Sequence, residues 1–129
     1  MKVAFSGSRY RSERYKIRKV LEIYNPEKDI IVHGGCPRGI DKEVDEIARE
    51  MGFKVVVFYP EKYEAKYFLK RNIKIAKFAD ILYAFPKRKT VELIFRKGIS
   101  LETLKGVRGG TEHTIRQFLK LGKPVVVIG

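Results

Sequence analysis

Cysteine, long apolar runs and a leader-like N-terminus are all scarce or missing in this sequence of 129 residues. The single cysteine, Cys36, has no partner for a disulfide within the chain, which is typical of proteins from a reducing cytoplasm. No apolar run approaches the ~20 residues that a membrane span requires. The first residues read as a strand and lack the apolar stretch of a signal peptide. We therefore expect a cytoplasmic protein that makes no membrane contact.

Residues that bind metals or form catalytic pairs are also rare. The two histidines, His33 and His113, lie far apart and show no metal-ligand spacing with the cysteine. No Ser-His-Asp arrangement and no pair of catalytic carboxylates can be identified. Cys36 follows His33 by three residues, but no third group that would orient such a pair is evident, so we do not expect a nucleophile there. We expect no metal and no cofactor.

Acidic residues are scarce in the second half of the chain. Residues 1–64 carry 13 basic and 11 acidic residues, whereas residues 65–129 carry 15 basic and 4 acidic, and the formal net charge is +13. This asymmetry predicts a localised positive surface and a polyanionic ligand or partner. Heat adaptation is the alternative, because the chain holds one glutamine and two asparagines. Thermophilic surfaces, however, pair their lysines with glutamates, and the second half lacks them.

Apolar strands alternate with amphipathic helices along the chain, and glycine and proline mark the turns. The expected strands are 3–5, 29–33, 53–58, 79–85 and 124–128. The expected helices are 12–24 with Ser12 as N-cap, 40–51, 64–78 with Phe68, Leu69, Ile73 and Ala76 facing the core, and 110–121. This alternation is typical of a parallel sheet covered on both faces. We predict one Rossmann-like α/β domain over residues 1–129, with a doubly wound five-stranded sheet of order 3-2-1-4-5.

Residues 87–108 interrupt the alternation and are too many for an ordinary connection between a strand and a helix. Apolar and polar residues alternate on both sides of Arg96-Lys97-Gly98, which predicts a β-hairpin inserted after the fourth strand. The alternating apolar residues are Val91, Leu93, Phe95, Ile99 and Leu101. An insertion at this point lies at the end of the sheet where ligands bind.

Three glycine-bearing turns precede helices, and the carboxyl ends of parallel strands should bring them together. Glycines and helix N-termini offer backbone N–H groups to an anion, and an arginine can hold phosphate with two hydrogen bonds. Asn72 lies in the middle of an expected helix, where asparagine is unfavourable, so it should make a specific hydrogen bond. The expected ligand-binding residues are Gly7, Ser8, Arg9, Gly34, Gly35, Gly39, Asp41, Arg71, Asn72, Gly109, Gly110, Thr111 and Thr114.

Each of these turns also has a purely structural explanation. The turn at 6–9 can be a plain connection with a surface arginine, and the segment 109–114 can be a helix cap. Asp41 either complements the dipole of the helix that it begins or contacts a ribose hydroxyl. These alternatives stay open at the level of sequence.

Together the motifs resemble those of the SLOG superfamily of Rossmann-like proteins. The similar segments are Gly7-Ser8-Arg9, Gly34-Gly35 with Gly39-Ile40-Asp41, and Gly109-Gly110-Thr111. Arg38 to Asp41, Tyr59-Pro60 and Arg71-Asn72 also resemble the DprA (Smf) core, and the short length and residues 79–86 resemble the small YspA-type members. The resemblance implies binding of a nucleotide or a nucleotide derivative. Phosphoribohydrolases of the superfamily carry P-G-G-x-G-T-x-x-E, but here Glu112 directly follows Thr111, so that activity is not implied.

We therefore expect nucleotide binding at the three turns. One alternative is DprA-like binding of single-stranded nucleic acid. Another is an enzyme that cleaves an N-glycosidic or phosphate bond of a nucleotide. An N-glycosidase needs a carboxylate near the anomeric carbon, for which only Asp41, Asp80 and Glu112 are candidates, and no catalytic residue can be assigned among them. The oligomeric state stays open, with a homodimer as one alternative. The basic residues expected to bind nucleic acid are Lys66, Lys70, Lys74, Lys87, Arg88, Lys89, Arg96 and Lys97.

Overall fold

The five strands form one parallel sheet in the order β3-β2-β1-β4-β5, in a computed structural model that describes all 129 residues. The strands are β1 (Lys2–Gly7), β2 (Ile30–His33), β3 (Lys54–Val57), β4 (Ile81–Phe85) and β5 (Val125–Val127), and the helices are α1 (Arg14–Leu21), α2 (Ile40–Glu50), α3 (Ala65–Phe78), α4 (Arg88–Lys97) and α5 (Gly110–Lys120). β1 lies at the centre, where Val3 is in register with Ile31 of β2 and Ile81 of β4. The predicted α/β class, strand order and Rossmann-like character are confirmed.

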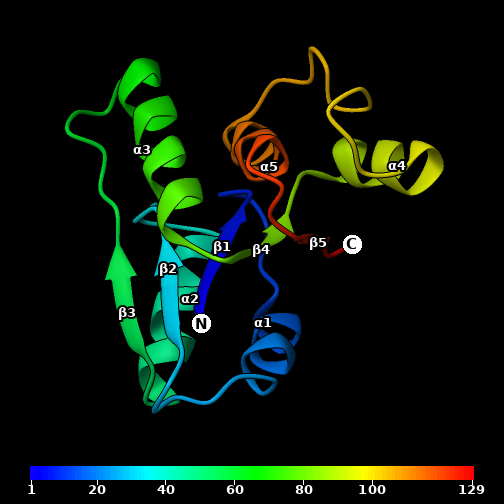
Figure 1. Cartoon of the computed structure of the whole chain (residues 1–129). Helices are drawn as coiled ribbons and strands as arrows, with labels where there is room; N and C mark the ends of the chain where they lie inside the picture. Colours follow the sequence, from blue (N-terminus) through cyan, green and yellow to red (C-terminus); the bar gives the residue numbers. More distant parts are fainter.

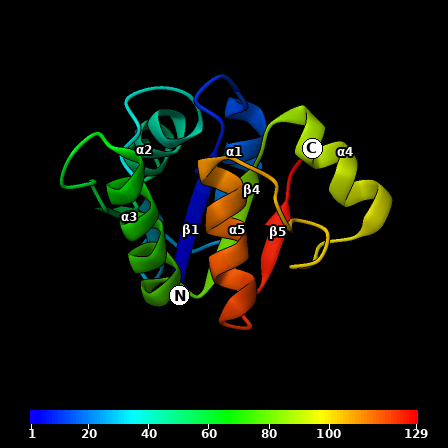
Figure 2. The ribbon, with the colours of Figure 1, turned by 90° about the horizontal axis from the view of Figure 1, so that it is seen from above.

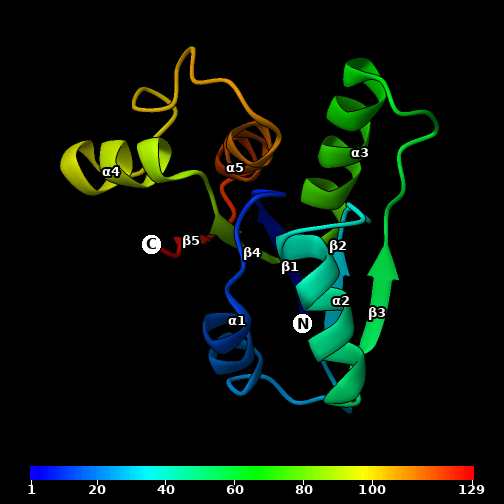
Figure 3. The same ribbon diagram turned by 180° about the vertical axis from the view of Figure 1, so that it is seen from behind.

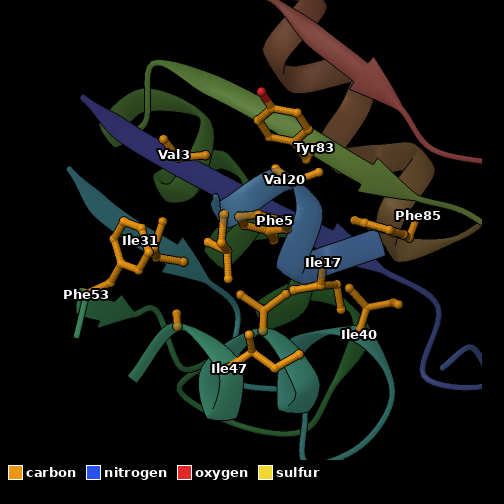
Figure 4. Packing of buried hydrophobic residues seen from close by; sticks show 13 residues of the cluster. Val3, Phe5, Ile17, Val20, Ile31, Ile40, Ile47, Phe53, Tyr83 and Phe85 are labelled. Atoms are coloured by element: carbon orange, nitrogen blue, oxygen red, sulfur yellow. The ribbon is translucent and has the colours of Figure 1, made fainter. Parts of the chain in front are cut away.

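Helices cover both faces of the sheet, as the apolar strands require. α1 and α2 lie on one face, and α3 and α5 lie on the other (Figures 1 and 3). On the first face, Phe5 of β1 packs among Ile17, Ile40 and Ile47 of the helices (Figure 4). Burial of each such side chain contributes roughly 1.5–3 kcal/mol. None of the helices combines the length and the apolar character needed to cross a membrane.

The second face is built from smaller side chains of the strands. Ala4, Leu82 and Ala84 pack against Ile75 of α3 and Phe118 of α5. Of the side chains expected to face the core from α3, Ala76 is buried, but Leu69 is 43% exposed. Phe68 and Ile73 are half-buried, and Ile75 and Asn72 are buried together with Ala76, so Ile75 faces the core where Leu69 was expected to do so.

The predicted β-hairpin is wrong, because residues 88–97 form helix α4. The buried residues of α4 are Thr90, Val91 and Ile94, which share one helical face, whereas Phe95 is 68% exposed. Further along, Leu104 is fully buried in the core of the second face. The segment is therefore an integral part of the fold. In Figure 2 it lies beyond β5, on the far side of α5 from α3.

The start of the first helix also differs from the prediction. α1 begins at Arg14, and its N-cap is Glu13 and not Ser12. The Ser12 hydroxyl donates instead to the carboxylate of Glu43 in α2, which also accepts the backbone N–H of Glu13. Glu43 therefore caps the beginning of α1 from outside the segment.

Candidate functional site

The three glycine turns meet at one cleft of about 280 Å³ at the carboxyl ends of β1 and β2. The first turn follows β1, the second follows β2, and the third precedes α5. This arrangement is the one expected at the central switch point of a doubly wound sheet. Ten of the expected residues line the cleft: Gly7, Ser8, Arg9, Gly34, Asp41, Arg71, Asn72, Gly109, Gly110 and Thr111.

The other three expected residues lie next to the cleft and do not line it. Gly35 lines a separate hollow together with His33. Gly39 has a φ of +74° and lies against the backbone of Arg9, so only glycine fits there. Thr114 is buried and donates a 2.9 Å hydrogen bond from its hydroxyl to the carbonyl of Gly110. Gly39 and Thr114 therefore support the turns that form the cleft walls.

Arg71 and Asn72 connect the second turn to the third. The guanidinium of Arg71 donates to the carbonyl of Gly34 and, at 2.8 Å, to the side-chain oxygen of Asn72. The Asn72 amide nitrogen lies 3.3 Å from the carbonyl of Gly110, to which it donates. The specific hydrogen bond expected of Asn72 is thus present. The pair fixes the spacing of two cleft walls that are distant in sequence.

One side of the cleft is well suited to an anion. The backbone N–H groups of Gly110, Thr111 and Glu112, in the first turn of α5, make no hydrogen bond within the protein. Such free groups carry the positive end of the helix dipole. Lys87 and Arg9 line the same cleft, and neither forms a salt bridge.

Two buried carboxyl groups also border the cleft. Burial raises the pKa of Asp41 above its ordinary value. The charge of a protonated His33, the N–H of Cys36, 3.2 Å from the carboxyl oxygen, and the nearby Arg71 oppose this shift, because they favour the ionised form. Burial likewise lowers the pKa of Arg71, and the charge of Asp41 opposes that shift. The Glu112 carboxylate lies against Gly109 and accepts a 2.6 Å hydrogen bond from the hydroxyl of Thr90.

Sequence reasoning did not assign seven of the lining residues to this cleft: Phe5, Ser6, Tyr10, Cys36, Ile75, Lys87 and Glu112. Position could have identified Lys87, because it follows β4 directly and the carboxyl ends of the strands meet here. Tyr10 could have been suspected less readily, because it is an aromatic residue next to the first turn. In the structure, the guanidinium of Arg38 lies 5.8 Å from the centre of the Tyr10 ring. From the sequence, Cys36 is notable only as a possible nucleophile near His33. The structure places it in the cleft wall, where its N–H holds Asp41.

The basic residues expected to bind nucleic acid do not form one surface. Lys66, Lys70 and Lys74 lie on α3, whereas Arg88, Lys89, Arg96 and Lys97 lie on α4. α5 lies between these two helices (Figures 1 and 2). Lys87 belongs to neither surface, because it lines the cleft and donates a 2.8 Å hydrogen bond to the carbonyl of Arg108.

Comparisons with protein-family models, with curated proteins and with solved structures find no match to this chain. The resemblance to the SLOG superfamily therefore stays a prediction from the motifs. The structure holds no cluster of three or more histidine, cysteine or acidic residues that could bind a metal ion.

Proposed function

We propose that the cleft binds a nucleotide or a nucleotide-derived ligand through its phosphate. The observation that carries the proposal is the group of free N–H donors at the start of α5, which lies in the same cleft as Arg9 and Lys87. Backbone donors at a helix N-terminus and flanking cations are the recurrent means of holding phosphate. The glycines at 109 and 110 leave these donors accessible.

Other residues of the cleft suit the nucleoside part of such a ligand. Asp41 offers a carboxyl oxygen to a ribose hydroxyl, and Tyr10 offers an aromatic ring at the rim, where it is almost fully exposed. The volume of about 280 Å³ lies near the lower end of the range for small-molecule sites. It therefore favours a single nucleotide unit in the cleft over a large dinucleotide.

Calorimetric titration with AMP, GMP, CMP and UMP and with the matching nucleosides tests this proposal. At least one nucleotide should bind, and its nucleoside should bind at least tenfold more weakly. Gly110→Ala is the matched variant, because a methyl group at this position meets no protein atom within 4 Å and the fold should be retained. It should weaken nucleotide binding by crowding the phosphate. Equal binding of nucleotide and nucleoside would contradict the proposal.

Single-stranded nucleic acid is the second candidate ligand, and the surface of α3 favours it. Lys66 and Lys70 lie 5.1 and 5.6 Å from the ring centre of Tyr67, and neither lysine has a carboxylate partner. Tyr59 and Tyr63 are exposed just before the helix. Lysines that hold a phosphate backbone and aromatics on which bases stack are the features that bind single strands. Arg71 borders both this surface and the cleft, so one strand can occupy both.

The geometry does not favour an N-glycosidase. Such an enzyme needs a free carboxylate near the anomeric carbon, and the cleft is lined by two carboxyl groups. Glu112 is held by Thr90 and lies against Gly109. Asp41 is buried, which raises its pKa, and it accepts the N–H of Cys36. We therefore expect no release of free base from nucleoside monophosphates. Turnover that is lost in Glu112→Ala would instead support the enzyme.

A further inference from the structure

His33 lies at the end of β2, directly before the second glycine turn, and is only 3% exposed. Its side chain does not line the cleft. Both ring nitrogens nevertheless have partners: Nε2 lies 2.8 Å from the carboxylate of Asp45, and Nδ1 lies 3.0 Å from the backbone nitrogen of Gly35. The imidazole therefore connects α2 to the turn that carries Gly34 and Cys36 into the cleft wall.

The partners fix the protonation state of the ring. Burial alone would raise the pKa of Asp45, but hydrogen bonds from His33 and Arg49 hold it below its ordinary value, so the group is ionised and can only accept. Nε2 must then donate to Asp45. Because Gly35 offers an N–H, Nδ1 must accept. The hydrogen bonds are satisfied only by a neutral imidazole with its proton on Nε2.

Gly35 depends on this contact. Its φ is +75°, and the ring of Tyr59 and the side chain of Val57 lie where a Cβ would be. The neighbouring groups are held too, because the carbonyl of Gly34 accepts from Arg71 and the N–H of Cys36 donates to Asp41. The Gly35 N–H bond to His33 is the contact that ties the middle of the turn to the sheet.

Protonation of Nδ1 would place two donors, the ring N–H and the Gly35 N–H, opposite each other. The turn would have to move, while the imidazolium would keep its ion pair with Asp45. The titratable and charged groups that surround the imidazole are Asp41, Lys42, Asp45, Glu46 and Arg49 of α2, Cys36 of the turn, and Tyr59 and Tyr63 after β3. Among these, only Asp45 bonds the ring directly.

We propose that His33 is a positioning residue that holds the second glycine turn in its binding conformation while it is neutral, and releases the turn when it is protonated. The proposal rests on the proposed function in one respect only: the turn is taken to be part of a ligand-binding cleft. The tautomer and the coupling to Gly35 can be tested without any ligand.

Two variants with amide side chains separate the two hydrogen bonds of the ring. The amide oxygen of Asn can take the place of Nδ1 and accept from Gly35, so His33→Asn should keep the turn in place. The amide of Gln reaches the position of Nε2, so His33→Gln keeps the contact to Asp45 and loses the bond to Gly35.

NMR spectroscopy of the isotopically labelled protein tests the first step. We expect a proton on Nε2 and none on Nδ1 at pH 8, and amide signals of Gly35 and Cys36 that shift with the same midpoint as the His33 ring during acidification. In His33→Asn the signals of the turn should stay constant over that range. A proton on Nδ1 at pH 8, or turn signals that ignore the titration of His33, would overturn the proposal.

Calorimetry with AMP, GMP, CMP and UMP tests the second step. Affinity should fall at least tenfold as His33 is protonated. His33→Gln should bind at least tenfold more weakly than the wild type at pH 8, and His33→Asn should restore binding and remove the pH-dependent loss. Wild-type affinity in His33→Gln would overturn the positioning role. Failure of all four nucleotides to bind the wild type would refute the proposed function, and the NMR titration would still decide the role of His33.

Discussion

Thr90 of α4 donates a 2.6 Å hydrogen bond to the carboxylate of Glu112 in the first turn of α5, and both side chains are buried, at 1% and 2% exposure. The two residues are 22 positions apart. A buried carboxylate is costly unless it is hydrogen-bonded. The contact therefore fastens the segment 88–108 to the helix that begins at the cleft.

Replacement of Thr90 by Val should lower the free energy of unfolding by about 1.5–3 kcal/mol, the range for a hydrogen bond to a charged group. Val keeps the shape of the side chain and removes only the donor. Urea denaturation monitored by circular dichroism measures the change. Thr103→Val is the matched control, because its hydroxyl bonds only to Ser100 in an exposed turn; it should change the free energy by less than ~0.5 kcal/mol. Equal effects in both variants would show that the buried pair does not stabilise the fold.

Asp41 predicts a particular pH dependence of stability. Because burial raises its pKa from the ordinary value of 3.8, the folded state binds more protons than the unfolded state between the two pKa values. The contribution of Asp41 to the free energy of unfolding therefore falls as pH rises through that window. Relative to the wild type, Asp41→Asn should gain stability as pH rises from 3.5 upward, in denaturation curves collected at each pH. A difference between the two proteins that does not vary with pH would contradict the raised pKa.

The separation of the two basic surfaces gives a matched pair of charge reversals. In the α3 variant, Lys66, Lys70 and Lys74 are changed to Glu, and binding of a labelled ~20-nucleotide single strand should weaken. The slope of log affinity against log salt concentration should become shallower by about 2, because each of the three lost phosphate contacts removes about 0.7. In the α4 variant, Lys89, Arg96 and Lys97 are changed to Glu, which alters the net charge by the same amount as in the α3 variant. These changes should leave the slope unchanged.

Fluorescence anisotropy at several salt concentrations measures both slopes. If the α4 variant changes the slope as much as the α3 variant, net charge and not the α3 surface determines binding. If the wild type binds no strand even at low salt, the nucleic-acid candidate is excluded and the basic residues are surface adaptation.

Features that depend on local pattern were predictable. The five strands, their order and the meeting of the three turns follow from apolar runs, helix boundaries and the rule that parallel strands end at one edge. Gly39 and Asn72 could be recognised because a glycine in a turn and an asparagine within a helix both need a specific reason. The sheet and the cleft are thus determined by short-range sequence features.

Features that depend on a distant partner were not predictable. The alternation of Val91, Leu93 and Phe95 fits a strand, and the helix is favoured by burial of Thr90 against Glu112, which no local pattern reveals. Ser12 likewise does not serve as the N-cap of α1, because its hydroxyl donates to Glu43, which lies 31 residues away in the sequence. The dyad of His33 and Asp45 joins a strand to the following helix and left no signal in the spacing.

The central claim is that phosphate is held between Arg9, Lys87 and the start of α5, and Arg9→Ala tests it most directly. Calorimetry with the nucleoside monophosphate that binds the wild type best should show binding weakened by about 1.5–3 kcal/mol, roughly 10- to 150-fold, the range for a hydrogen bond to a charged group. Arg18→Ala removes the same charge from the exposed side of α1, outside the cleft, and should bind like the wild type. Unchanged affinity in Arg9→Ala, with the fold intact, would contradict the account.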